Sequence, residues 1–348
     1  RSLAMSACSA ASTLELRTAK NEQLPCSPTA DVGRFMELIG RLSGTDELPN
    51  EEEALARSLF DWGAGDLLLS RAPGRLDVMG GIADYSGSLV LQMPIAEATM
   101  VAIQTRHDSN QVRIVSLGAA AAGRTPSFSL GLEDIRKSLR NADAPFAALR
   151  ATIKSSHGDC SWAAYVIGAL AVLMHEGVGR FETGLSLLVY SEVPEGKGVS
   201  SSAAVEVASM IALLATEDLL LAPPERLACL CQKVENAVVG APCGVMDQMA
   251  SALGLDGQLL SLLCRPALLR EPVRIPTSMR FWGIDSGVRH FVGGSDYGSV
   301  RCAAFMGRTM LQRRIKAREK MAHVAEVSPE ELAALGDAGL PDEISGGA

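Results

Sequence analysis

Apolar residues spaced three and four positions apart predict a series of helices along the chain. The predicted helices cover Val32–Leu42, Glu51–Trp62, Trp162–His175, Ala203–Glu217, Glu225–Val238 and Tyr297–His323. The segment Trp162–His175 is apolar on nearly every side, which is typical of a helix buried in a core rather than one on a surface.

Other segments have the pattern of strands. Three of them lie between residues 66 and 104, and a glycine-rich stretch, Gly74–Gly87, separates the first two. Residues Gly184–Val193 alternate as a half-buried strand, and residues 258–293 are strand-like again. Strands and helices therefore mix in an irregular order without any internal repeat, which favours layers of the α+β class.

The first thirty residues lack periodicity. They are rich in Ser, Ala and Thr, contain Pro25 and Pro28, and are predicted to form a linker or a flexible tail. The chain begins with Arg1 rather than with Met, so we expect it to be a fragment or a processed product.

Composition narrows the function classes. The 348 residues are 47% hydrophobic, enough for a large core, and 32 Lys and Arg against 40 Asp and Glu give a net charge of −8. This acidic balance argues against a nucleic acid or an anionic membrane as partner. The longest apolar run, Trp162–Met174, has 13 residues and is too short to span a bilayer.

Cysteine and histidine usage bears on compartment and metals. Eight cysteines lie mostly in apolar stretches without a Cys-x-x-Cys pair, which is typical of buried thiols in a reducing compartment, and we expect a cytoplasmic protein. The five histidines show no zinc-ligand spacing, so a zinc site is not expected.

The strongest chemical motif runs from Pro194 to Ala204. A strand enters a glycine-rich turn, and three serines then open a helix, in the order Pro-Glu-Gly-Lys-Gly-Val-Ser-Ser-Ser-Ala-Ala. Glycines allow close approach of the backbone to an anion, and the first N–H groups of a helix point toward it. The spacing does not match a P-loop, and a capped helix after a tight turn is the simplest alternative.

Two further segments place charged residues in unusual settings. Arg71–Ser88 holds Arg75, Asp77 and Asp84 around glycine-rich turns, where polar groups can converge on a ligand; a surface loop with a salt bridge would look the same. Val239–Ser251 sets Asp247 among apolar residues, and Glu235 lies twelve residues before it. A carboxylate drawn into an apolar setting must be paired or functional.

Together these segments resemble the GHMP kinase superfamily, and within it the galactokinase branch. The galactokinase signature is similar to Pro73–Gly87, the nucleotide loop to Pro194–Ala203, and the Cys-Gly-Ile-Met-Asp-Gln segment to Cys243–Gln248. A fourth stretch, Asp285–Tyr297, resembles the Asp-Ser/Thr-x-Val-x-His segment and its later Tyr. The text of Ser70–Ile95 also looks like plant and algal L-arabinokinases.

The resemblance implies a two-domain GHMP kinase fold of the α+β class. Residues 1–30 would be the linker or tail, residues 31–240 a ribosomal-protein-S5-like ATP-binding domain, and residues 241–348 a ferredoxin-like domain. The Gly-rich Lys-x-Thr/Ser-Gly-x-Gly-x-Gly-Gly loop of the superfamily is not found after Tyr297. We therefore expect the second domain to be incomplete, with exposed sheet edges.

The resemblance also implies a sugar-1-kinase that uses ATP and Mg²⁺. Asp247 and Arg75 match catalytic positions, and Ser202 and Glu235 match metal ligands. The sugar contacts would be Gly81, Asp84, Gly244 and Tyr297. The nucleotide would be bound by Pro194, Gly196, Lys197, Gly198, Ser200, Ser201 and Ser202.

A departure from the galactokinase signature bears on the substrate. The Glu-His-Thr-Asp of galactokinases, whose Glu contacts the 6-hydroxyl, is Gly81-Ile82-Ala83-Asp84 here. Such a site suits a sugar with the galactose ring pattern but no C6, which is L-arabinopyranose. Galactokinase itself, and a catalytically silent sugar sensor, remain the alternatives. By the same resemblance, a glycosyltransferase-like module would precede the kinase in the full-length protein.

Overall fold

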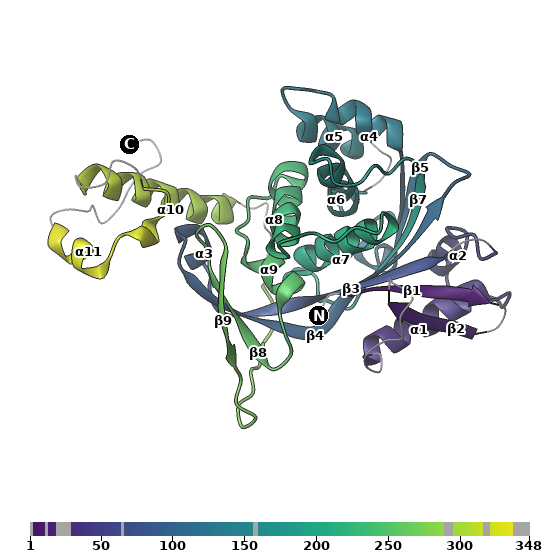
Figure 1. The fold of residues 1–348 in the computed structure, drawn as a ribbon, viewed down its shortest axis with the longest axis horizontal. Helices are drawn as coiled ribbons and strands as arrows, with labels where there is room; N and C mark the ends of the chain where they lie inside the picture. The colour runs from purple at the N-terminus through teal and green to yellow at the C-terminus, as the bar shows by residue number, and fades with distance from the viewer. Residues whose placement is uncertain are drawn as a thin grey trace.

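A mixed β-sheet organises the computed structural model (Figure 1). The structure describes residues 3–10, 13–18, 29–63, 66–155, 159–288, 295–315 and 321–336. Within these ranges the sheet has nine strands in the order β2-β1-β3-β4-β7-β5-β6, with β8 paired to β4 and β9 to β8. All pairings are antiparallel except β5 with β7.

The strands are β1 (Leu3–Ala10), β2 (Thr13–Thr18), β3 (Leu67–Met79), β4 (Leu89–Arg106), β5 (Gln111–Ser116), β6 (Ser127–Gly131), β7 (Gly184–Ser191), β8 (Gln258–Leu263) and β9 (Leu268–Arg274). The first helices are α1 (Ala30–Ser43), α2 (Glu51–Arg57), α3 (Ala83–Ser86), the 3₁₀ turn η1 (Ala120–Ala122), α4 (Leu132–Leu139), α5 (Pro145–Lys154) and α6 (Ala163–His175). They are followed by α7 (Ser201–Thr216), α8 (Glu225–Lys233), the π-helical η2 (Val234–Val239), α9 (Met246–Leu253), α10 (Ser295–Arg314), the 3₁₀ turn η3 (Val324–Glu326) and α11 (Pro329–Leu335).

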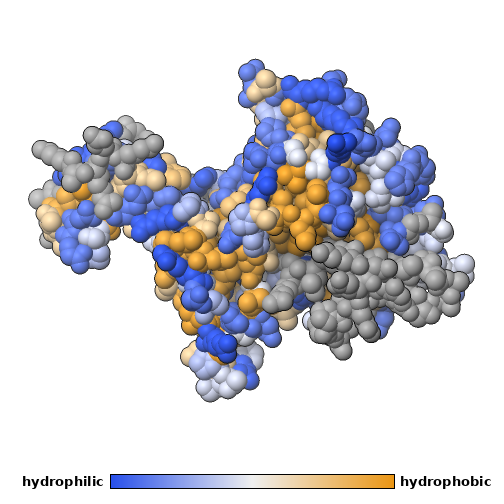
Figure 2. Space-filling view, viewed as in Figure 1, coloured by the Kyte–Doolittle hydropathy of each residue, from blue (hydrophilic) through white to orange (hydrophobic). Residues whose placement is uncertain are grey.

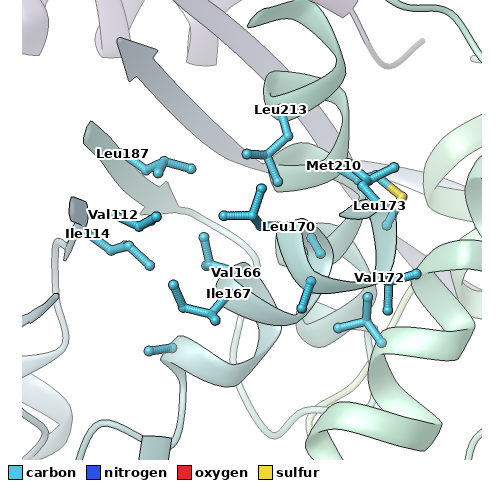
Figure 3. Close-up of a cluster of buried hydrophobic side chains, with 14 of the residues drawn as sticks. Val112, Ile114, Val166, Ile167, Leu170, Val172, Leu173, Leu187, Met210 and Leu213 are labelled. Atoms are coloured by element: carbon cyan, nitrogen blue, oxygen red, sulfur yellow. The ribbon is translucent and has the colours of Figure 1, made fainter. Parts of the chain in front are cut away.

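The main core lies between the helices α4–α8 and one face of the sheet. Helix α6 is at its centre, with Val166 and Leu170 facing Val112 of β5, Leu187 of β7 and side chains of α7 (Figure 3). All of these residues are buried. Each aliphatic side chain removed from water contributes roughly 1.5–3 kcal/mol. Burial of this apolar helix, predicted from sequence, is confirmed.

The opposite face of the sheet is covered by α1 and α2. Phe35, Ile39 and Leu42 of α1 pack against side chains of β3 and β4 that alternate with those facing the main core. The sheet is therefore buried on both faces in its centre, and the two helices predicted before residue 62 are confirmed, although α2 ends at Arg57.

Several predicted boundaries move because of tertiary contacts. Strand β3 continues to Met79, since its pairing with β4 resumes at Arg75, so the turn between them covers residues 80–88. The helix predicted to reach His323 ends at Arg314. His323 instead has extended backbone and caps η3, its side chain and that of Glu326 forming a capping box.

Two described segments within the region predicted as a linker or tail, residues 3–10 and 13–18, are strands. Strand β1 pairs with β3, with Leu3 opposite Arg71, and β2 pairs with β1. The exposed N–H and C=O groups along the edge of β3 offer hydrogen bonds to any extended segment, whatever its side chains. A segment dominated by Ser and Ala has too little apolar contrast for this pairing to be predicted.

The division predicted after residue 240 does not coincide with a break in the sheet. Strand β8 pairs with β4, Leu263 opposite Leu89, and α9 packs against β8 through Met249 and Leu260. Within the described residues no strand follows β9; α10 and α11 extend away from the sheet (Figure 1). The structure also contains, among those residues, no helix long and apolar enough to cross a membrane.

Apolar side chains are exposed around the β8–β9 hairpin (Figure 2). Leu268 and Val273 of β9 are about half exposed, and Trp282 and Ile284 after it are almost fully exposed. Among the described strands β9 pairs with β8 alone, so the outer edge of this hairpin has no partner strand there.

Candidate active site

The loop between β7 and α7 brings backbone groups toward a cavity. Gly196 and Gly198 both have φ of 70°, a conformation that favours glycine. Ser200 follows at the N-cap of α7 with φ of 60°, in the left-handed region that costs a non-glycine residue of order 1–3 kcal/mol. The loop thus aims the first free N–H groups of a 16-residue helix at the cavity, where an anion would be stabilised.

A buried hydroxyl in this loop has no partner within the described chain. Ser200 is 9% exposed, and its Oγ atom makes no hydrogen bond there. Strain and an unsatisfied polar atom at one residue are typical of a site completed by a ligand.

Arg75 of β3 connects the loop to Asp247 in the first turn of α9. Its Nε and Nη2 atoms donate to Asp247 Oδ1 at 3.0 and 2.7 Å, and its Nη1 donates to the carbonyl of Gly198 at 2.7 Å. The Arg75 guanidinium is buried, whereas the Asp247 side chain is 27% exposed toward the cavity. One charged side chain therefore holds the glycine loop and the candidate catalytic carboxylate in a common geometry.

Close backbone packing accompanies this pair. The Arg75 N–H donates to the carbonyl of Val199 at 3.1 Å. A Cβ atom on Gly74 would lie 2.7 Å from that same carbonyl oxygen, so only glycine allows β3 and the loop to approach this closely.

Glu235 lies on η2 behind Ser202 and faces the same cavity. It is 2% exposed, and burial together with the charge of Asp247 raises its pKa to about 7, while a hydrogen bond with the Ser202 side chain opposes that shift. A hydroxyl and a carboxylate side by side are hard oxygen donors, the type that Mg²⁺ prefers when waters and phosphates complete its shell. No cluster of three or more acidic, His or Cys ligands occurs among the described residues, so the protein would supply only part of such a shell.

Asp84 and Gly244 meet on the sugar side predicted from sequence. Asp84, in α3, accepts from the backbone N–H of Met246 at 3.1 Å and from the Cys264 thiol, and burial raises its pKa. A Cβ atom on Gly244 would lie 1.7 Å from Asp84 Oδ2. A side chain at position 244 would collide with Asp84, which explains the glycine beside this buried carboxylate. The contact of the Cys264 thiol with Asp84 was not predictable from sequence, because no motif marks Cys264.

The turn that contains Gly81 is held by the carboxylate of Asp77, a residue with no role in the predicted sugar site. Asp77 accepts from the Gly81 N–H and from Gln92 Nε2, each at 2.7 Å. Gly81 has φ of 57°, and nothing lies within 4 Å of where its Cβ would be. The neighbouring Ile82 side chain is half exposed. The position predicted to face the far end of the sugar is thus empty of side-chain atoms.

Two of the predicted site residues, Lys197 and Tyr297, are not among the described side chains that line the cavity beside the glycine loop. Lys197 makes an ion pair with Asp285 at 2.5 Å and does not line the cavity. Tyr297 lies in the first turn of α10, and its side chain is outside the described residues, as is His290.

Two adjoining cavities of about 500 and 380 Å³ surround the glycine loop. Arg75, Asp247 and Glu235 line the larger one, and Pro194 lines the smaller. Both are lined by Ser201, Ser202, Trp162, Tyr165 and Arg124. The last three were not identified from sequence, since aromatic residues in an apolar helix and one Arg in a loop carry no motif.

Comparisons with known proteins agree with this arrangement. The family described as "GHMP kinases N terminal domain" matches residues 164–255, and the "Galactokinase galactose-binding signature" matches residues 60–105. The chain is 50% identical to an L-arabinokinase of Arabidopsis thaliana, over 77% of this chain and 27% of that protein. It is 34% identical to a galactokinase of Chloroflexus aggregans, over 79% of this chain and 62% of that protein.

A solved structure supports the fold. The galactokinase of Lactococcus lactis, complexed with galactose, superimposes with a TM-score of 0.60 at 22% identity, over 79% of this chain and 64% of that one. The chain spans about a quarter of the length of the L-arabinokinase and less than two thirds of the galactokinases it matches. The chain therefore matches the model of the GHMP kinase N-terminal domain and the galactokinase galactose-binding signature, and it shares half of its aligned residues with an L-arabinokinase and about a third with a galactokinase.

Proposed function

We propose that the protein is an ATP-dependent sugar kinase that phosphorylates the anomeric hydroxyl of L-arabinose, giving L-arabinose 1-phosphate. The observation that carries this proposal is the Arg75–Asp247 pair, which holds a partly exposed carboxylate beside the glycine loop. The similarity to an L-arabinokinase and to galactokinases supports the reaction class. ATP and a small sugar are then the partners, rather than nucleic acid or a membrane.

The glycine loop and the start of α7 would bind the phosphates. N–H groups between Gly196 and Ser202 form an anion site, and the positive end of the α7 dipole adds to it. The aromatic Trp162 and Tyr165 line both cavities and could contact the nucleoside. We propose that Ser202 and Glu235 hold Mg²⁺, which would neutralise charge on the transferred phosphoryl group.

Asp247 is positioned to accept a proton. As the anomeric oxygen attacks the γ-phosphorus and the bond to the β,γ-bridging oxygen breaks, the hydroxyl proton would pass to the Asp247 carboxylate. Arg75 orients that carboxylate through two nitrogens that donate to one of its oxygens. Its positive charge also lies beside the loop on which negative charge collects.

The sugar would lie toward Asp84 and Gly81. The Asp84 carboxylate, fixed by the Met246 N–H, could accept from ring hydroxyls. At Gly81 no side chain is present to bond a 6-hydroxyl, which favours a pentose over a hexose. Galactokinase activity, or sugar sensing without turnover, are the competing functions.

We expect kcat/KM for L-arabinose to exceed that for D-galactose by roughly 10–200-fold, the usual range when one small substituent decides the fit. The measurement is ATP turnover by the purified protein with each sugar and Mg²⁺. Equal or reversed values would make the protein a galactokinase. Sugar binding without turnover of either sugar would favour the sensor.

Arg124 gives a second test, on the nucleotide side. It lines both cavities and is paired with Glu195 of the loop at 2.9 and 2.6 Å, while its Nε has no partner within the described chain. We expect Arg124→Gln to raise KM for ATP about 10-fold, the loss of one charge-assisted contact, with KM for the sugar unchanged. Arg113→Gln on β5, which bonds only the carbonyl of Ser58 in the described structure, is the matched control. An unchanged KM for ATP would remove Arg124 from the nucleotide site.

We further propose, from the resemblance to L-arabinokinases, that a glycosyltransferase-like module precedes the kinase in the full-length protein and that the protein acts in the cytoplasm. Free thiols at all six cysteines whose side chains the structure describes suit a reducing compartment.

A further inference from the structure

Three buried polar side chains from three elements meet behind the candidate metal ligands. Glu206 of α7 and Gln248 of α9 are fully buried, and Glu235 of η2 is 2% exposed. The Gln248 amide nitrogen donates to Glu206 Oε2 at 3.1 Å and to Glu235 Oε2 at 2.8 Å, with Cys243 Sγ more distant at 3.7 Å. One amide thus bridges two carboxyl groups, using both of its hydrogens.

Glu206 and Gln248 each have one polar atom without a hydrogen-bond partner in the described part of the chain. Glu206 Oε1 and Gln248 Oε1 are both inaccessible to solvent, and neither has a hydrogen-bond partner in the described part of the chain. Both are acceptors if Glu206 is ionised, so they cannot satisfy each other. One proton on Glu206 Oε1 turns it into a donor, and an acid facing an amide then forms two bonds in a ring.

The surroundings of Glu206 disfavour a negative charge. The ionisable groups that interact with it are all acidic: Glu235 on η2, Asp247 on α9, Tyr165 on α6, Cys231 on α8 and Cys243 before α9. It forms no ion pair among the described residues, and Arg75 of β3 is already engaged by Asp247 and Gly198. Burial and the charge of Glu235 raise the pKa of Glu206 well above its ordinary range.

We propose that Glu206 is a neutral acid whose Oε1–H donates to Gln248 Oε1, fixing the amide so that its second N–H points at Glu235. Glu206 is then a positioning residue for the metal ligand. This role rests on the proposed function, because it assumes that Glu235 binds Mg²⁺. Without the ring, the Gln248 amide can rotate by half a turn and direct its oxygen at Glu235. Two oxygen acceptors would then face each other, and the Glu235 carboxylate would lose its hydrogen bond.

The protonation state has a test that needs no activity. Because Glu206 is protonated in the folded chain and ionised in the unfolded one above about pH 4.3, its contribution to stability falls as pH rises. Glu206→Gln preserves both bonds of the ring and does not titrate. The quantity to measure is the melting temperature of Glu206→Gln minus that of the unchanged protein. We expect this difference to increase by several degrees between pH 5.5 and pH 8.5. The comparison is repeated with Glu235→Gln present in both proteins, which removes the titration of Glu235. A constant or falling difference would mean that Glu206 is ionised and would overturn the proposal.

The positioning role is tested by Glu206→Leu, which keeps the volume and loses both bonds. We expect the Mg²⁺ concentration that gives half-maximal turnover to rise about 10-fold in Glu206→Leu, with KM for the sugar unchanged. The Mg²⁺ concentration that gives half-maximal ADP binding in calorimetry should rise by the same factor. In Glu206→Gln both should stay within about threefold, since the ring is kept. A lower melting temperature with unchanged Mg²⁺ dependence would show a purely structural role and sink the proposal. If Glu206→Leu does not fold, the pH comparison decides alone. If no sugar is turned over, the proposed function fails while the melting and calorimetry results still stand.

Discussion

Asp247→Ala is expected to lower kcat by roughly 10²–10⁴-fold, the usual contribution of one acid–base group. Asp247 is the carboxylate that Arg75 holds at the mouth of the larger cavity, and alanine can neither accept a proton nor orient a hydroxyl. Because the loop and the sugar side are built by other residues, KM for ATP and for the sugar should change far less than kcat. Steady-state kinetics with L-arabinose and MgATP provides the measurement.

A matched control separates this effect from a general loss of charge. Asp256 is an exposed carboxylate in the turn before β8, and Asp256→Ala should leave kcat unchanged. Near-normal turnover in Asp247→Ala would remove Asp247 from the mechanism. An equally large loss in both variants would indicate that the fold, rather than the reaction, had been damaged.

Arg75→Met is expected to lower kcat by about 10²–10³-fold, the range for removing one group that stabilises developing charge. Methionine keeps an unbranched apolar stem but has no group that donates to Asp247 Oδ1 or to the Gly198 carbonyl. Arg75→Lys keeps the charge but cannot make the same three bonds at once, so we expect an intermediate loss. The measurement is again kcat, together with the melting temperature of each variant.

The control for Arg75 lies four residues earlier on the same strand. Arg71 pairs with Asp31 at 2.7 Å, and both side chains are largely buried. Arg71→Met should lower the melting temperature, because it leaves the Asp31 carboxylate buried without its partner, and should leave kcat unchanged. If Arg75→Met lowered stability as Arg71→Met does but preserved kcat, Arg75 would be a structural residue only.

Local patterns were enough for much of the secondary structure. The apolar segment that became α6 and the alternation in β7 are signals carried by consecutive residues, since burial on one face or all faces repeats with the period of the element. The turn and helix around Gly196 were predictable for the same reason: glycines and hydroxyl residues act within a few positions of themselves.

The pairing of distant segments was not predictable. The edge of β3 accepts β1 through backbone atoms, which any residue supplies, and the short β5 and β6 carry too little pattern to be found. Likewise, Trp162 and Tyr165 are apolar positions of a helix in sequence, and only the path of the glycine loop past them makes them part of a cavity.

The residues that can do chemistry were recognisable from the sequence: the glycine loop, Asp247 among apolar neighbours, and a glycine where galactokinases have a glutamate. Their identities are local, and so is the backbone freedom that glycine confers. The contact of Arg75 with Asp247 across 172 positions of sequence, and the bridge that Gln248 forms between Glu206 and Glu235, arise from the fold and could not be read from the sequence. Hydrogen bonds of buried groups depend on where separate elements cross, because each buried donor or acceptor must be satisfied by whichever group the packing brings to it.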